Sequence, residues 1–218
     1  MRSRLIPILA FFCSLALAGC AQASPRSEVS PPASSSASTP TQDPTPTPAS
    51  APQLTITLDG IVYAHDNTTK LYPLSDGQQV VELFKTVTGV TPAGEMIPQP
   101  YTTDVPYITR YTWGGALVSV YVDGGSSDIR ITAPALNGVP IKTEEGIAVG
   151  STQADVVTAH GWNARPGFTD TFGLATREVP GTTSLMHDGA VGIDYIGLFM
   201  KNGNVDQIVI TANDYGDL

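Results

Sequence analysis

The globular part of the chain, residues 54–218, alternates hydrophobic and polar positions over short stretches. Alternation with a period of two is typical of a β-strand that buries one face. The clearest example is PYITRYTW at residues 106–113. It predicts a strand that carries the following side chains on one face: Tyr107, Thr109, Tyr111 and Trp113.

Further strands are predicted to pair as hairpins, because short turns rich in Asp, Asn and Gly separate them. ALVSVYV and DIRITA are predicted to meet across the turn at residues 123–125. GIDYIGLFM and DQIVITA are predicted to meet across the turn at residues 202–204. Both halves of the globular part therefore contain an antiparallel hairpin.

Helices are predicted where hydrophobic positions recur every three or four residues. The first covers residues 75–89, begins at a serine with Gln78 in the capping-box position, and ends at a glycine. The second covers residues 151–161 and is about one turn shorter. Its N-terminus has a candidate capping box of Thr152 and Asp155.

The chain also resembles itself. TLDGIVY matches ALNGVPI, SDGQQVV matches STQADVV, and DGGSSDIRITA matches NGNVDQIVITA, in the same order and at a nearly constant offset. These matches predict tandem units at residues 54–133 and 134–218. The predicted fold class is therefore α+β, with two tandem helix-plus-antiparallel-hairpin repeats that form a sheet covered by helices on one face.

The segment EGIAVGSTQADVVTAHG, residues 145–161, resembles part of two families. These are the β-lactamase-inhibitor-protein-like domains and the small BamE/SmpA envelope lipoproteins. The resemblance lies in Val149, Gly150, Thr152, Val156 and Gly161, and it implies tandem helix-plus-sheet units whose concave sheet binds a protein. Disulfides of these families have no counterpart in this chain.

The N-terminus, residues 1–19, predicts a lipoprotein signal peptide. A short positive start with Arg2 and Arg4 precedes an apolar stretch of residues 5–18, which is too short to span a bilayer. The Leu-Ala-Gly-Cys sequence that ends at Cys20 resembles the lipobox of bacterial lipoproteins. That resemblance implies cleavage before Cys20, a lipid on its thiol, and an extracytoplasmic protein anchored to the cell membrane. The alternative is an ordinary cleaved signal peptide with an incidental cysteine.

Residues 20–53 predict a disordered tether that follows the lipidated cysteine. Pro, Ser, Thr and Ala dominate the segment, and Val29 is its only large aliphatic residue. Such a composition cannot bury enough apolar surface to offset the entropy of ordering. Because Cys13 lies in the signal peptide and Cys20 is the only other cysteine, no disulfide within the mature chain is expected.

Charge and motifs exclude several classes of function. The formal net charge of −9 argues against nucleic acid as a direct partner. The sequence has no Gly-x-Ser-x-Gly, Ser-x-x-Lys or His-Glu-x-x-His motif and no phosphate-binding glycine loop, so no catalytic residue, cofactor or metal is predicted. The pair His187 and Asp188 has no nucleophile next to it. Asp123 and Asp128 are explained by a hairpin turn rather than by calcium.

Aromatic side chains on predicted strands form the candidate binding face: Tyr107, Tyr111, Trp113, Tyr121, Tyr195 and Phe199. One interpretation is that they pack under the helices as core residues. The other is that they lie on the exposed face of the sheet, where aromatic residues often dominate binding energy.

The sequence leaves several hypotheses for function. The first is a non-catalytic lipoprotein, anchored to the membrane at Cys20, which recognises an envelope or extracellular protein through its sheet. The second is a hydrolase of cell-wall polymers that uses carboxylates such as Asp194 or Glu178. The third is a structural scaffold of the envelope. The oligomeric state and the identity of the partner do not follow from composition.

Replacing Cys20 tests the anchor. Cys20→Ser removes the thiol that lipidation needs, so the protein should move from the membrane fraction to the medium or remain an uncleaved precursor. Mass spectrometry of the wild-type N-terminus should find an acylated Cys20. A soluble mature chain that begins at another residue would contradict the prediction.

Overall fold

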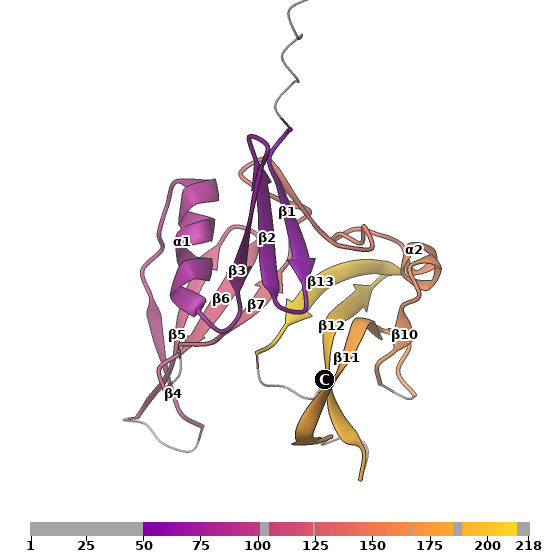
Figure 1. Ribbon diagram of the computed structural model, residues 1–218. Helices are drawn as coiled ribbons and strands as arrows, with labels where there is room; N and C mark the ends of the chain where they lie inside the picture. Colours follow the sequence, from indigo (N-terminus) through magenta and orange to yellow (C-terminus); the bar gives the residue numbers. More distant parts are fainter. Residues whose placement is uncertain (1–49, 101–104, 124, 166, 185–188, 213–218) are drawn as a thin grey trace, which may run out of the picture. The chain divides into compact units, whose positions relative to one another are not determined.

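The computed structural model describes residues 50–100, 105–123, 125–165, 167–184 and 189–212. The predicted signal peptide, Cys20, most of the predicted tether, and the pair His187 and Asp188 lie outside these residues. The described residues all belong to one compact unit, and Figure 1 shows its helices and strands.

Strands dominate the described residues. In chain order the elements are β1 (Gln53–Thr57), β2 (Gly60–His65), β3 (Thr68–Pro73), α1 (Gly77–Thr88), β4 (Glu95–Pro98), β5 (Pro106–Trp113), β6 (Ala116–Tyr121), β7 (Ser127–Ile131), β8 (Ala135–Leu136), β9 (Val139–Thr143), α2 (Gln153–Thr158), β10 (Trp162–Asn163), β11 (Thr171–Thr183), β12 (Val191–Lys201) and β13 (Asn204–Ile210).

The larger sheet has eight strands in the order β10-β11-β12-β13-β7-β6-β5-β4. Each half is a meander in which consecutive strands pair antiparallel. The halves join where β7 pairs antiparallel with β13, with Arg130 opposite Val209. The two meanders therefore pair through their last strands, and each meander falls within one of the predicted units.

The smaller sheet has five strands in the order β3-β2-β1-β9-β8. It also combines the predicted units, because β1 from the first pairs in parallel with β9 from the second, with Leu54 opposite Ile141. The two units are therefore interlocked by hydrogen bonds in both sheets.

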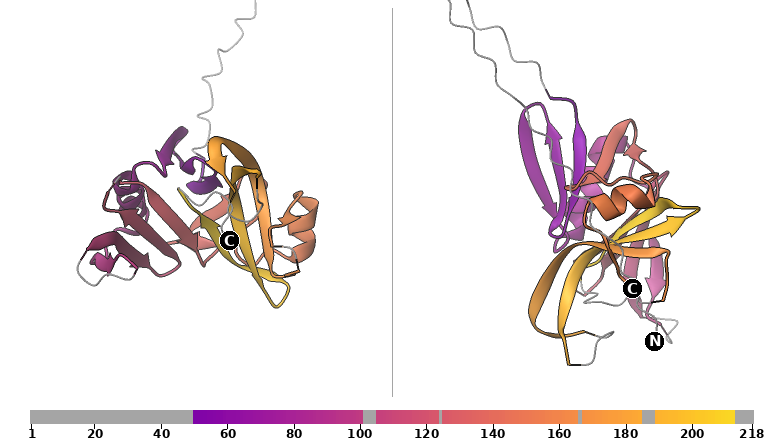
Figure 2. Two further views of the ribbon diagram at one scale, coloured as in Figure 1. Left: turned by 90° about the horizontal axis from the view of Figure 1, so that it is seen from below. Right: turned by 90° about the vertical axis from the view of Figure 1, so that its right-hand side faces the viewer.

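One hydrophobic core lies between the elements. Figures 1 and 2 show α1 and strands β1–β3 on one side of β5–β7. The core joins Leu54, Ile56 and Ile61 of the smaller sheet to Phe84 of α1 and Ile129 of the larger sheet. Each of these side chains is at most 1% exposed, so the larger sheet has one face that is covered by α1 and the smaller sheet.

The predicted fold class is wrong. Of the described residues, 53% are in strands and 12% in helices, and two large sheets replace the expected helix-plus-hairpin repeats. A four-stranded meander rather than a hairpin follows each helix. The two helices do not cover the sheet by themselves, since only α1 packs on it broadly, whereas α2 has six residues and buries only Val156. Strands β1–β3 and β9 of the smaller sheet pack on the larger sheet instead. Local periodicity indicates that a segment is a strand, but it does not indicate that the strand belongs to a second sheet packed on the first.

Each helix has the expected cap at one end, but the C-cap of α2 is Ala159 rather than the predicted Gly161. Gly89 ends α1 in the left-handed conformation, and Thr152 with Asp155 forms a complete capping box at α2. The N-cap of α1 lies one residue later than predicted. Asp76 accepts a hydrogen bond from the backbone of Gln79, and the Gln79 side chain returns a second bond to the same carboxylate.

The predicted hairpins β6–β7 and β12–β13 are confirmed by their strand register. At the turn of the second hairpin, Asn202 has φ 53° and Gly203 has φ 78°. Two successive residues with positive φ define the type I′ turn that matches the twist of paired strands.

In the described residues, no helix is long and apolar enough to cross a membrane.

Trp113 belongs to the covered face. Its ring lies edge-to-face against Phe84 of α1, with the ring centroids 5.3 Å apart. The indole Nε1 donates a hydrogen bond of 2.9 Å to the carbonyl oxygen of Val90, and the residue is only 8% exposed. The interpretation that Trp113 lies on an exposed sheet face is therefore wrong, because α1 packs onto this side of β5.

Truncating Trp113 should destabilise the fold. Trp113→Ala removes the contact with Phe84 and leaves a cavity, so the free energy of unfolding should fall by about 3–5 kcal/mol. Urea denaturation followed by circular dichroism measures the change. Thr112→Ala, at an exposed position of the same strand, is the control and should change stability by less than about 0.5 kcal/mol. Equal stability of the two variants would contradict the placement of Trp113 in the core.

Candidate functional site

The face of the eight-stranded sheet that points away from the core is the candidate functional site, and we call it the open face. Residues that oppose each other across an antiparallel pair point to the same face. The register therefore assigns one row to the open face: Leu117, Arg130, Val209, Gly197, Gly173 and Trp162. Figure 2 (left) shows α1 and β1–β3 on the other side of β5–β7.

The open face contains a groove of about 380 Å³ across strands β5, β6, β7, β13 and β12. Most of the side chains that line it are half-buried, unlike their neighbours on the covered face. The lining residues are Ile108, Arg110, Leu117, Ser119, Asp128, Ile129, Arg130, Phe199, Val209 and Thr211. Apolar walls and charged groups thus share one hollow, which is the usual composition of a binding surface.

An aromatic pair lies on the same face of the sheet, toward its β10 edge. The Trp162 ring packs against Gly173, where an added Cβ would come within 2.4 Å of the indole. Its ring centroid is 5.3 Å from that of Tyr195, and its Nε1 donates a 2.9 Å hydrogen bond to the Thr176 hydroxyl. A glycine at position 173 therefore allows the indole to lie directly on the strand.

The carboxylate in the groove is already engaged. Asp128 accepts a 2.7 Å hydrogen bond from the Tyr121 hydroxyl at one oxygen and a 3.0 Å bond from the backbone N–H of Ala212 at the other. The second bond holds the end of the β13 segment to β7. Asp128 therefore organises the edge of the groove.

The positive groups in the groove are not engaged. Arg110 and Arg130 make no ion pair or hydrogen bond with any described residue, and the buried Nε of Arg110 has no acceptor. The other arginines of the described residues do have partners. Arg165 lies over the ring of Phe168 at 4.2 Å, and Arg177 binds aspartates.

The structure divides the predicted aromatic face. Tyr111 lies next to Trp113 on the covered side, with ring centroids 6.3 Å apart. Phe199 lines the groove, and the register places Tyr195 on the same face of β12. The six predicted residues therefore do not form one surface, because α1 covers the end of β5 that carries Trp113.

Tyr107 and Tyr121 do contact each other, edge-to-face, with ring centroids 5.3 Å apart. They link the ends of β5 and β6, and the Tyr121 hydroxyl is the group that donates to Asp128. These tyrosines therefore support the edge of the groove, and both are half-buried.

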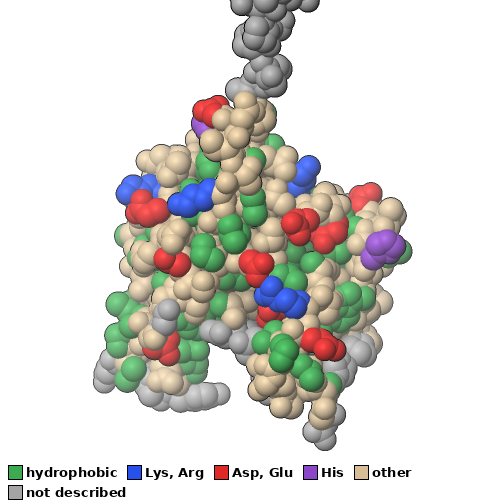
Figure 3. Space-filling view, in the orientation of Figure 1, with side chains coloured by type: hydrophobic (Ala, Val, Ile, Leu, Met, Phe, Trp, Pro, Cys, Tyr) green, Lys and Arg blue, Asp and Glu red, His purple; other side chains and the backbone are tan. Residues whose placement is uncertain are grey.

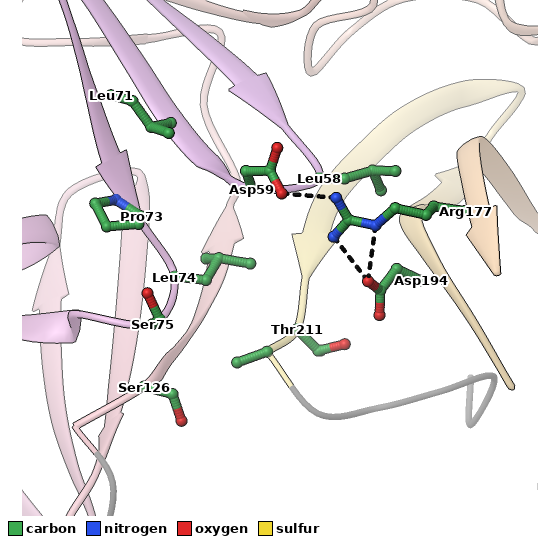
Figure 4. A pocket seen from close by; sticks show the side chains of 11 residues that line it. Leu58, Asp59, Leu71, Pro73, Leu74, Ser75, Ser126, Arg177, Asp194 and Thr211 are labelled. Carbon is green, nitrogen blue, oxygen red and sulfur yellow. Dashed lines mark hydrogen bonds and ion pairs between the residues drawn. The ribbon is translucent and has the colours of Figure 1, made fainter. Parts of the chain in front are cut away.

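A second pocket of about 440 Å³ lies where the β1–β2 turn meets β11 and β12 (Figure 4). Arg177 extends between two carboxylates, 2.7 Å from Asp59 and 2.9 Å from Asp194. The hydrogen bonds that Arg177 donates, first to Asp59 and then to Asp194, raise the pKa of Arg177. On the side of the molecule seen in Figure 3, positive and negative side chains are interspersed.

The described residues do not form a catalytic constellation. Asp194 and Asp59 both bind Arg177, so neither is a free general base, and Glu178 is not among the residues that line the pocket. The lowered pKa values of Asp76 and Asp155 have a structural cause, since each accepts hydrogen bonds as a helix cap, first from the side chains of Gln79 and Thr152. Among these residues, no cluster of His, Cys, Asp and Glu could hold a metal ion.

Sequence reasoning missed the arginines of the open face. Arg130 lies between Ile129 and Ile131 in DIRITA, and alternation alone predicts that it points away from the buried isoleucines. Arg110 lies between Thr109 and Tyr111 in PYITRYTW. Alternation therefore places Arg110 on the face of the strand opposite Tyr111 and Trp113. Alternation therefore indicated both arginines, but the aromatic residues predicted on β5 lie on the opposite face of that strand.

The chain was compared with models of known protein families, with curated proteins and with solved structures, and none of them matches. The resemblance of residues 145–161 to inhibitor-like and BamE/SmpA-like segments therefore remains a prediction. Function has to be inferred from the geometry of the chain itself.

Removing the guanidinium of Arg177 tests how much its ion pairs with Asp59 and Asp194 contribute to the stability of the fold. Because the Arg177 side chain is 47% exposed, Arg177→Met should lower the free energy of unfolding by no more than about 1 kcal/mol. Urea denaturation at low and high salt measures the effect, which salt should reduce. The double variant with Asp59→Asn should lose little more stability than the single variant. A much larger loss would show that the pair behaves as a buried ion pair.

Proposed function

We propose that this protein is an extracytoplasmic lipoprotein, anchored to the membrane through Cys20, whose globular unit binds a protein partner without catalysis. The proposed site of binding is the open face of the eight-stranded sheet. The observation that carries the proposal is the groove, which combines the half-buried Phe199 and Leu117 with two arginines that have no partner among the described residues. Exposed aromatic and arginine side chains are the groups that contribute most to protein interfaces.

The contrast between the two faces of the sheet supports this proposal. On the covered face, Ile129, Leu198 and Ile208 are at most 1% exposed, as in an ordinary core. On the open face, the large side chains Ile108, Leu117 and Phe199 remain partly exposed. A partner that covered them would remove apolar surface from water, which is the main favourable contribution to association.

The hydrolase hypothesis has less support. It needs carboxylates in one cleft that are free to exchange protons with a substrate. Asp194 is instead held by Arg177, and Glu178 is exposed on the same strand as that arginine. The carboxylate of the groove, Asp128, has a donor on each oxygen. These contacts favour binding over catalysis.

A photo-reactive amino acid at the open face tests the proposal in intact cells. With p-benzoylphenylalanine in place of Phe199, irradiation should join the protein to a partner of discrete mass. The same group in place of Val157, which is 57% exposed on α2, is the matched control and should give no such product. Equal labelling from both positions, or none from Phe199, would contradict the proposed function.

A further inference from the structure

Arg110 and Arg130 line the same groove, and each carries a guanidinium that can donate hydrogen bonds. Arg110 lies on β5 and Arg130 on β7, separated by β6. Neighbouring strands lie about 4.8 Å apart, so these backbones are roughly 10 Å apart and the long side chains reach the same groove. Both side chains line it.

One buried donor of this groove, the Nε of Arg110, has no acceptor among the described residues. Asp128 already accepts from Tyr121 and Ala212. Glu95 lies opposite Arg110 in the register of β4 and β5, but it is exposed and no ion pair forms between them. A buried donor without an acceptor is unfavourable, so an acceptor from outside would be stabilised here.

The surroundings of the arginines are apolar. Ile108 and Leu117 lie on the β5–β6 side of the groove, and Phe199 and Val209 lie on the β12–β13 side. An occupant with an acidic group alone would leave these side chains in contact with water. The groove therefore matches a segment in which an acidic side chain stands next to an apolar one.

We propose that the protein partner presents an Asp or Glu carboxylate, flanked by apolar side chains, to Arg110 and Arg130. This inference rests on the proposed function and names the chemistry of its partner. Guanidinium groups bind carboxylates through paired, charge-assisted hydrogen bonds, and the bound carboxylate supplies the acceptor that the Arg110 Nε lacks. The formal net charge of the chain is −9, so the attraction is local to this groove.

Carbodiimide coupling tests the identity of the contacting group. Arg110→Lys and Arg130→Lys keep the positive charge and supply an amine, which a zero-length carbodiimide joins to a nearby carboxylate. Treatment of intact cells should give an amide between the new lysine and an Asp or Glu of another protein, identified by mass spectrometry. Lys142, in β9 of the smaller sheet, is the control in the same sample and should not couple to that protein.

The same arginines are tested by loss of charge. In the protein with the photo-reactive group at position 199, Arg110→Gln and Arg130→Gln should each reduce the product about tenfold or more, whereas Lys142→Gln should leave it unchanged. Thermal unfolding checks that each variant folds, and the exposed Arg130 provides a variant that does not disturb a buried group.

The outcomes separate the two proposals. If the product at position 199 forms but neither arginine variant reduces it, the carboxylate inference is wrong and the proposed function stands. If wild-type arginines give no product at position 199, the proposed function fails. A product that depends on the arginines but gives no lysine–carboxylate amide would show that the partner presents another anion, such as a phosphate, and would also overturn the inference.

Discussion

The antiparallel pairing of β7 with β13 is the interaction on which the remaining architecture depends. It joins two four-stranded meanders into one eight-stranded sheet. Without it, each meander would expose an edge strand with unpaired backbone groups. The pairing also brings Arg130 opposite Val209, so a charged position of one meander and an apolar position of the other meet in one groove. A continuous sheet is therefore the source of both the core and the candidate site.

Successive side chains of a strand point to opposite faces of the sheet. When one face is buried in the core, every second side chain therefore points away from the core. Strands β1–β3 and helix α1 cover the first face and form a core that includes Phe84 and Trp113. The second face carries Arg110, Arg130 and Phe199, which all line the groove. The buried Nε of Arg110 has no hydrogen-bond acceptor among the described residues. The proposed binding to a partner rests on this difference between the faces.

Several parts of the structure could be predicted from local sequence. The left-handed Gly89, the capping box of Thr152 and Asp155, and the hairpin turn at Asn202 follow from side-chain and backbone preferences over a few residues. Long-range pairing could not be predicted in this way. The parallel contact of β1 with β9 joins residues far apart in the chain, and no local pattern specifies which strand edge another strand will meet.

The sequence by itself determined which residues of β5 share a face, since alternation places Tyr111 with Trp113 and Arg110 on the opposite side. Only the tertiary structure decided which face is covered, because α1 packs through Phe84 onto the side of Trp113. The aromatic positions therefore became core, and the arginines became the candidate site. The physical reason is that alternation fixes relative orientation within a strand, whereas burial depends on which distant element packs against it.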